Sequence, residues 1–320
     1  MEVDMNKHNL FISSSKKNVF LCVKAMMLFV LILTFCLKVA MPQYLNLYNA
    51  SLIDKVNRLN SLDEPKIVLL GNSNVAFGIE SQLIEDAFSM PVVNMGLHGG
   101  LGNAFHEQMA RLNVCRGDIY IICHSNFSDN SEITDAVLAW TTIENHLELW
   151  RILRVQDIYP MIKAYPTYLK NCLELLVAGE GNQLTEGCYS RNAFNEYGDV
   201  CFERMLTKYT FENVINPPKI NKTAINRINE LNHWLNERDA ILLVAGYPIG
   251  KGNLTAPDEE FVKIQKELEE KLECPFISEY KDYMFDYDLF YDSDLHLTTQ
   301  GAQIRTNQLI SDLKQWKEDK

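Results

Sequence analysis

The sequence lacks the close cysteine pairs that are typical of metal-binding and redox sites. None of its eight cysteines forms a Cys-x-x-Cys pair, and no metal-ligand spacing is visible. We therefore expect neither a metal nor a cofactor. In an exported domain Cys188 and Cys201 are candidates for a disulfide bond, and buried free thiols are the alternative.

Basic residues are also scarce. The chain has 30 lysines and arginines against 42 acidic residues, which gives a formal net charge of −12. Nucleic-acid binding requires clustered Lys and Arg, so we exclude a nucleic acid as partner. The sequence shows no internal repeat and no low-complexity run. What remains is a chain long enough for one α/β domain with a sizeable insertion.

Residues 19–41 are apolar except for Lys24 and Lys38. A membrane span needs roughly 20 residues, and both lysines are placed to extend toward opposite headgroup layers. More basic residues precede this segment than follow it, which predicts a cytoplasmic N-terminus and an exported remainder. A cleaved signal peptide is the alternative, but no small-x-small cleavage site follows Met41. A buried core helix fits less well, because the flanks are basic.

Beyond this segment, short apolar runs alternate with amphipathic segments, which predicts a parallel sheet covered by helices. The expected strands are 66–70, 91–95, 118–123, 240–246 and 275–277. The expected helices are 81–88, a helix running toward 112, and 257–273.

The segment 131–218 interrupts this alternation with helical patterns rich in Trp and Tyr. We interpret it as a helical insertion whose aromatic residues form core, with a carbohydrate-binding platform as the alternative. The predicted organisation is therefore a cytoplasmic tail (1–18), a transmembrane anchor (19–41), a linker (42–65) and one α/β domain (66–320).

A candidate nucleophile follows the first predicted strand. Ser73 comes directly after that apolar run, and Asp292, Asp294 and His296 lie close together before the final helix. Serine is a poor nucleophile unless an imidazole accepts its proton, and that imidazole must be oriented by a carboxylate. These residues therefore indicate a nucleophilic hydrolase or transferase.

Two further elements belong to the same edge of the predicted sheet. The glycine-rich loop 96–102 follows the second strand and Asn126 follows the third. Active sites of open parallel sheets form beyond the carboxyl ends of the strands. We expect these elements to meet Ser73 there.

With these motifs the chain resembles the SGNH (GDSL-like) hydrolase superfamily over residues 66–128 and 240–315. The motifs that carry the resemblance are Ser73 in Gly71-Asn72-Ser73-Asn74, Gly99 in Asn94-Met95-Gly96-Leu97-His98-Gly99, Asn126, and His296. Val75 replaces the last glycine of the Gly-x-Ser-x-Gly elbow, which argues against an α/β-hydrolase.

The resemblance implies a fold and a set of roles. The fold is an α/β three-layer sandwich with a central, flavodoxin-like parallel sheet. His296 takes the proton of Ser73, and an acyl-serine forms without a cofactor. The oxyanion is stabilised by the backbone N–H groups of Ser73 and Gly99, with the side-chain amide of Asn126.

The sequence departs from the family pattern in two blocks. His124-Ser125-Asn126-Phe127 lacks the glycine and aspartate of the usual Gly-x-Asn-Asp block. Ser293 occupies the position three before the histidine where the family usually has Asp. Either Asp292 or Asp294 is then the partner of His296, with a slight preference for Asp292.

Two tracts resemble membrane-tethered polysaccharide O-acylation proteins. The first is 295–298 followed by Gly301 and Arg305, and the second is 190–199, which includes Arg191. Arg305 is a candidate for contact with an anionic substrate, with a solvated helix position as the alternative, and Arg191 is a candidate for substrate contact.

Three functions follow from the resemblance. The first is a single-pass, membrane-tethered serine O-acyltransferase or acetyltransferase that acts on a cell-surface polysaccharide or glycolipid beside a multi-spanning membrane acyl donor protein. The second is a tethered carbohydrate esterase or deacetylase that uses the same residues. The third is a non-catalytic glycan-binding or assembly module, because fold resemblance does not establish activity.

Overall fold

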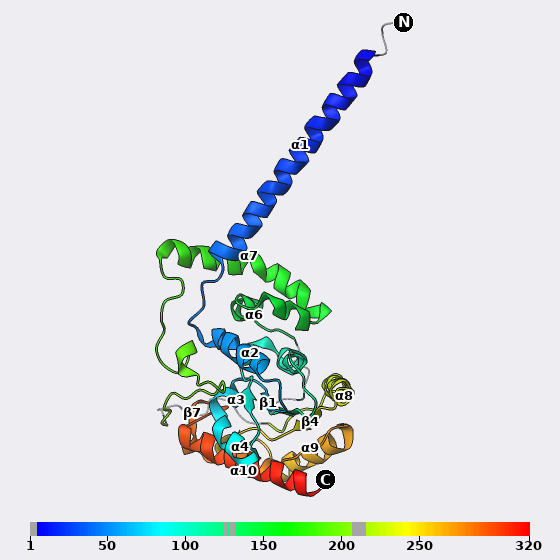
Figure 1. The fold of residues 1–320 in the computed structure, drawn as a ribbon. Helices are drawn as coiled ribbons and strands as arrows, with labels where there is room; N and C mark the ends of the chain where they lie inside the picture. Colours follow the sequence, from blue (N-terminus) through cyan, green and yellow to red (C-terminus); the bar gives the residue numbers. More distant parts are fainter. Residues whose placement is uncertain (1–4, 125–126, 128–131, 207–215) are drawn as a thin grey trace.

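The computed structural model describes residues 5–124, 127, 132–206 and 216–320 (Figure 1). A long N-terminal helix, α1 (Met5–Phe35), projects from a folded body and ends in a π-helical turn, η1 (Cys36–Ala40). Within it, Lys17–Ala40 is long and apolar enough to cross a membrane, with a hydropathy of 2.6. A helix of this kind near the N-terminus is a membrane anchor or a signal sequence.

The body is built on a parallel sheet. Its strands are β1 (Ile67–Leu70), β2 (Val92–Asn94), β3 (Ile119–Ile122) and β4 (Ile241–Val244). They are arranged in the order β2-β1-β3-β4, with Val68 of β1 opposite Val93 and Tyr120. Four of the five predicted strands are therefore confirmed.

The fifth predicted strand, 275–277, is reduced to a single bridge. Phe276 pairs in parallel with Val244, and Ile277 N donates to Val244 O. Beyond Ile277 the chain is drawn to the last helix, where the Ser278 hydroxyl donates to Asp312 at 2.5 Å. The ladder is therefore too short to count as a strand.

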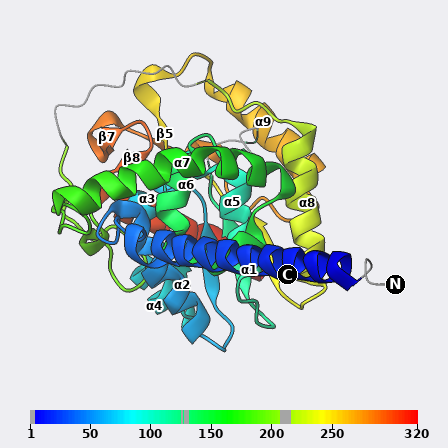
Figure 2. The ribbon, with the colours of Figure 1, turned by 90° about the horizontal axis from the view of Figure 1, so that it is seen from above.

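Helices cover both faces of the sheet, which makes this an α/β fold of three layers (Figures 1 and 2). Alternate strand residues belong to two separate cores: Val68 and Tyr120 to one, Leu69 and Ile121 to the other. The first core includes residues of α2 (Leu52–Ser61), α5 (Asn103–Gln108), α8 (Lys222–Asn236) and α9 (Asp258–Lys271). The second includes residues of α4 (Ser81–Phe88) and α10 (Thr299–Glu318).

The predicted insertion is helical in its first half. It contains α6 (Ala136–Ile143), the 3₁₀ helix η5 (Leu147–Ile152) and α7 (Val155–Ala178). Between α7 and residue 206 the chain has a short 3₁₀ helix, η6 (Arg191–Ala193), and no α-helix. Trp140 is buried and stacks on Tyr168 with ring centroids 5.4 Å apart. The interpretation of the aromatics as core is confirmed for this pair.

The segment assigned to a linker is packed into the body. Leu52, Val56 and Leu59 of α2 are buried. Upstream, Tyr44 N donates to Glu144 at 2.8 Å and Leu45 N donates to Asn182 at 2.9 Å. An amphipathic helix that buries its apolar face behaves as part of a domain, so residues 42–65 are structured.

A buried ion pair joins the starts of β1 and β3. Lys66 Nζ lies 3.0 Å from Asp118 Oδ2, and neither side chain is exposed. The Asp118 carboxylate also accepts hydrogen bonds from Cys115 N and the Tyr120 hydroxyl. Breaking such a pair leaves an uncompensated charge in the interior.

We expect Lys66→Met to lower the free energy of unfolding by about 3–5 kcal/mol. Urea unfolding of the full chain in detergent measures this loss. Arg116→Met is the matched control, because Arg116 pairs with Asp239 at the surface, where such pairs contribute about 1 kcal/mol or less. Equal losses for the two variants would contradict the assignment.

Candidate active site

Ser73 is positioned at the carboxyl end of β1. It is the first residue of the short helix α3 (Ser73–Gly78), and the helix is capped by Asn72, whose Oδ1 accepts from Asn74 N at 3.0 Å. Because Asn72 provides the cap, the Ser73 hydroxyl is not used for capping. It faces a histidine instead.

Three side chains form one hydrogen-bonded row. His296 Nε2 lies 2.8 Å from Ser73 Oγ, and His296 Nδ1 lies 2.8 Å from Asp292 Oδ1. The imidazole therefore contacts the hydroxyl with one nitrogen and the carboxylate with the other. This is the geometry in which histidine removes the proton of a serine while a carboxylate fixes its tautomer.

The hairpin of β7 (Phe290–Ser293) and β8 (His296–Leu297) brings the acid and the imidazole together. Ser293 Oγ accepts from His296 N at 3.1 Å and from Leu295 N at 3.3 Å, which closes the turn. Ser293, in the place where the family pattern has Asp, thus has a role in the turn. Of the two carboxylates left open by the sequence, Asp292 is the one bonded to His296.

The Phe77 ring packs against the imidazole of His296. Its ring stacks on that of His296 with centroids 4.1 Å apart and planes 7° from parallel. Phe77 is fully buried and follows Ser73 by one helical turn, so both side chains lie on the same face of α3. Arg204 joins this helix to β8 by donating to the carbonyl oxygens of Phe77 and Leu297, each at 3.0 Å.

Tyr189 is a further member of the row. Its hydroxyl donates to Asp292 Oδ2 at 2.6 Å and lies 3.3 Å from His296 Nδ1. Burial, together with the neighbouring Asp292, raises the pKa of Tyr189, so the phenol remains a donor. Burial alone would raise the pKa of Asp292, but the hydrogen bonds from His296 and Tyr189 outweigh it and lower that pKa. Asp292 is therefore ionised at neutral pH.

Sequence reasoning did not select Tyr189 or Phe77 as site residues. Tyr189 precedes Asp292 by 103 residues, and no local pattern joins them. Phe77 offered a usable signal, because a residue four positions after a serine at a helix start faces the same way.

The row opens into a cavity of about 340 Å³. Its lining residues are Tyr48, Ser73, His98, Gly99, Tyr189, Ser293, Asp294, Leu295 and His296. The cavity thus brings Gly99 and Asp294, both predicted from the sequence, to the same place as Ser73 and His296. Ser73 and Gly99, whose backbone amides the resemblance assigns to the oxyanion site, both line it.

In the glycine-rich loop a side chain is sterically excluded at Gly96. A Cβ there would lie 2.5 Å from Ala76 N, whereas a Cβ at Gly99 would meet Asn72 at an ordinary 3.7 Å. The loop therefore packs closely on α3 through Gly96, while Gly99 borders the open cavity. Asn126, the third predicted oxyanion donor, lies outside the described residues.

The two arginines proposed from the sequence do not line the cavity. Arg305 is only 1% exposed and donates to Asn74 O at 2.6 Å, so it braces α10 against α3 and is not solvated. Arg191 holds Asp54 through two hydrogen bonds of 2.7 Å. Both guanidinium groups are used in structural contacts.

The tract 190–199 has a structural role through its last residue. Asp199 accepts hydrogen bonds from the Ser81 hydroxyl at 2.6 Å and from Asn94 Nδ2 at 2.8 Å. Asn94 in turn accepts from Gly96 N at 2.9 Å. Asp199 therefore holds Asn94 in place, and Asn94 in turn holds the glycine-rich loop at Gly96.

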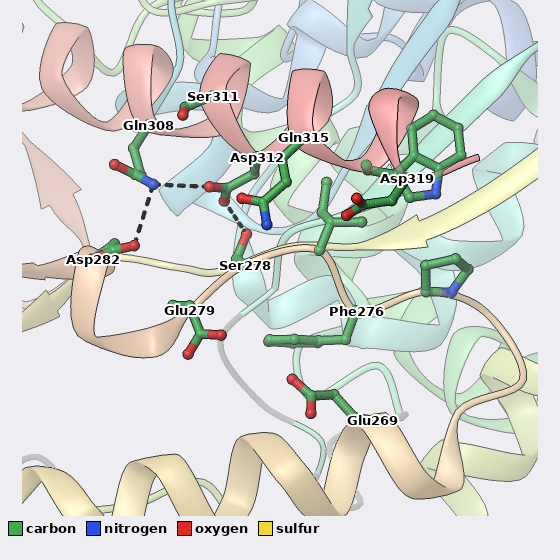
Figure 3. A pocket seen from close by; sticks show the side chains of 13 residues that line it. Glu269, Phe276, Ser278, Glu279, Asp282, Gln308, Ser311, Asp312, Gln315 and Asp319 are labelled. Carbon is green, nitrogen blue, oxygen red and sulfur yellow. Dashed lines mark hydrogen bonds between the residues drawn. The ribbon is translucent and has the colours of Figure 1, made fainter.

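A second cavity, of about 350 Å³, lies between α9, α10 and the segment 275–282 (Figure 3). It is rich in carboxylates, and its Ser278 hydroxyl donates to Asp312. No histidine is among the described residues that line it. Among the described residues, Ser278 therefore has no imidazole base, and the cavity at Ser73 is the better candidate for nucleophilic chemistry.

Comparisons with known proteins identify no family. No protein-family model matches the chain, and no curated protein matches it. A solved structure described as "a putative platelet activating factor from Streptococcus pneumonia" aligns with 91% of this chain and 98% of that chain. The sequence identity is 12% and the TM-score 0.38, a likeness too weak to support an argument.

In the described part of the chain, no group of three His, Cys, Asp or Glu side chains is arranged to hold a metal. Cys188 and Cys201 are both free thiols. The chemistry that the described residues can support is attack by an activated serine on an electrophilic carbon or phosphorus, followed by transfer of the bound group.

We expect a fluorophosphonate to label Ser73. The hydroxyl is activated by His296, and the cavity admits a small electrophile. Gel fluorescence and peptide mass spectrometry of the full chain measure the labelling. Ser73→Ala abolishes it, whereas Ser278→Ala, which alters the serine in the second cavity, leaves it intact. Labelling that persists in Ser73→Ala would contradict the assignment.

We expect Tyr189→Phe to slow that labelling roughly tenfold. The variant removes the hydrogen bond from the Tyr189 hydroxyl to the charged Asp292. Such a bond contributes about 1.5–3 kcal/mol. Tyr189 is half-exposed, so water can replace part of that contribution and we expect an effect at the lower end of the range. Pseudo-first-order rate constants measure the effect, and Tyr159→Phe, which changes an exposed phenol on α7, is the control. A rate equal to that of the control would exclude a role for the Tyr189 hydroxyl.

Proposed function

We propose that the chain is a membrane-anchored, serine-dependent acyl-transfer enzyme that modifies a cell-surface polysaccharide or glycolipid. The proposal depends on one observation above all, the row of Ser73, His296 and Asp292 at the edge of a cavity. The resemblance of the sequence to SGNH hydrolases adds the expectation that the transferred group is an acyl group.

In the first half-reaction His296 takes the proton of Ser73 as Oγ attacks the acyl carbonyl. The tetrahedral oxyanion is stabilised by the backbone N–H groups of Ser73 and Gly99, with Asn126 as the third donor. Loss of one such donor lowers turnover by about 10²–10³. The intermediate collapses when His296 returns the proton to the leaving group, which leaves an acyl-serine.

In the second half-reaction the acyl group leaves Ser73. A sugar hydroxyl gives up its proton to His296 and attacks the ester carbonyl. His296 then returns the proton to Ser73 Oγ as the ester bond breaks, which regenerates Ser73 and completes an O-acyltransferase cycle. The proposed anchor favours this reaction, because it keeps the site beside the membrane, where a multi-spanning acyl donor protein would deliver the group.

A tethered esterase or deacetylase is the second candidate. In that case water replaces the sugar hydroxyl as the attacking group. Tyr189, which touches the carboxylate of the row, is 48% exposed, so water reaches this end of the site. The balance between the two reactions is determined by how well a bound acceptor excludes that water.

The proposed topology places residues 1–18 in the cytoplasm, a span over 19–41 and the α/β domain outside. It is supported by the apolar helix Lys17–Ala40 and by the excess of lysines before it.

We expect the full chain in detergent to cleave p-nitrophenyl acetate, and Ser73→Ala and His296→Ala to lower kcat/KM at least about 10³-fold. Ser278→Ala is the matched control and retains the wild-type rate. Added oligosaccharide distinguishes the two reactions: acylated sugar identifies a transferase, and free acetate alone identifies an esterase. A wild-type rate no higher than those of the Ser73 and His296 variants would leave only the non-catalytic module.

A further inference from the structure

Helix α7 presents an apolar stripe to solvent. Residues spaced three or four apart fall on one side of the helix: Val155, Tyr159, Ile162, Pro166, Leu169, Leu173 and Val177. Val155, Tyr159, Ile162 and Val177 are 83%, 72%, 61% and 88% exposed. The opposite side, which includes Met161, Tyr168 and Cys172, is buried in the body. Both sides of α7 are therefore apolar, and the described chain covers only one.

The base of α1 lies against this helix. Figure 1 shows α7 lying across the top of the body, where α1 departs from it. The π-helical turn η1 contacts α7, and the chain becomes buried at Ala40 and Met41. The C-terminal end of α1 and helix α7 thus lie together at the same end of the body.

The connection between α1 and α7 is rigidly braced. Tyr44 N donates to Glu144 of the α6 region at 2.8 Å, and the Tyr168 hydroxyl of α7 donates to the same carboxylate at 2.5 Å. The rings of Tyr44 and Tyr168 have centroids 6.3 Å apart. Because residues 41–44 are held in this way, α1 cannot be placed in a bilayer without bringing α7 to the bilayer surface.

We propose that α7 lies in the membrane interface, with its apolar stripe inserted at the boundary between lipid headgroups and acyl chains. The inference rests on the proposed membrane anchor. Amphipathic helices bind bilayers in this orientation, and aromatic residues such as Tyr159 favour the interface. Lys163, exposed beside the stripe, extends toward lipid phosphates. Lipid is the indicated occupant because η1, at the end of the helix proposed to span the bilayer, contacts α7.

The consequence is a two-point attachment. A single span permits the body to swing about its base, whereas a helix held in the interface fixes the body's orientation. The cavity at Ser73 is then presented at a constant height and direction relative to the membrane, where acyl donor and glycan acceptor must both reach it.

The test uses the full chain at one copy per lipid nanodisc made of phosphatidylcholine and phosphatidylglycerol. An environment-sensitive fluorescent amino acid replaces Tyr159, Leu28 or Lys314 in turn, and lipids brominated near the headgroup or, in separate nanodiscs, near the end of the acyl chain serve as quenchers. Leu28 is in the middle of the proposed span, and Lys314 is exposed on α10 at the far end of the body (Figure 1). We expect bromine near the headgroup to quench the probe at 159 at least twofold, bromine near the chain end to quench the probe at 28 at least twofold, and neither to affect the probe at 314.

Each outcome has a distinct meaning. Quenching at 159 that is lost when Ile162→Glu and Val177→Glu are added supports the proposal. A probe at 159 quenched no more than that at 314, while the probe at 28 is quenched, overturns it and leaves the anchor in place. A blue shift at 159 without quenching places the probe in an apolar environment other than lipid and also overturns it. Absence of quenching at 28 refutes the anchor itself, and fluorophosphonate labelling of the same samples tests the acyl-transfer proposal independently.

Discussion

The contact between helix α3 and the hairpin β7–β8 determines whether this molecule has a site at all. The hairpin carries His296 and Asp292, and α3 carries both the serine that the imidazole faces and the phenyl ring on which it stacks. One helical turn separates Ser73 from Phe77, so any movement of α3 displaces the nucleophile and the support of its base together. The geometry is therefore set by one rigid junction, which is how preorganised sites hold their groups to within a fraction of an ångström.

Buried cations secure that junction in a protein whose net charge is −12. Arg204 donates to carbonyl oxygens of α3 and β8, and Arg305 donates to Asn74 O beside the proposed nucleophile. Lys55 donates to the carbonyl oxygens of Asn94 and Gly198, behind the glycine-rich loop. Each is almost completely buried, and burial lowers the pKa of Lys55 to about 7. These side chains donate to buried backbone oxygens of α3, β8 and β2 and of Gly198, groups that require hydrogen-bond partners in the interior.

How much of the fold and of the candidate site could be predicted from the sequence depends on how far apart along the chain the interacting residues lie. The four strands follow from short apolar runs, and Ser73 and His296 follow from their positions at strand ends and in the last hairpin. The sequence alone narrowed the carboxylate partner of His296 to Asp292 or Asp294. The choice between them depends on the turn that Ser293 closes, which only the structure shows. Arg305 looked like a surface residue, yet it is buried because Asn74 O, 231 positions away in sequence, accepts its hydrogen bond. Tyr189 and Asp199 likewise act through contacts that no local pattern encodes.

The structured segment 42–65 changes how the proposed anchor relates to the proposed chemistry. A flexible linker would allow the domain to sample a wide volume above the bilayer, and encounter with a membrane-embedded acyl donor would then be a matter of effective concentration. Here Tyr44, Leu45 and α2 are packed into the body, and α7, which carries the apolar stripe, lies on the side of the body from which α1 departs. With the proposed anchor, the orientation of the domain relative to the bilayer would thus be fixed by the fold before any partner binds. For a transfer reaction in which donor and acceptor approach one serine, this arrangement reduces the orientational freedom lost on reaching the reactive geometry, whereas simple hydrolysis, with water as acceptor, would gain nothing from it.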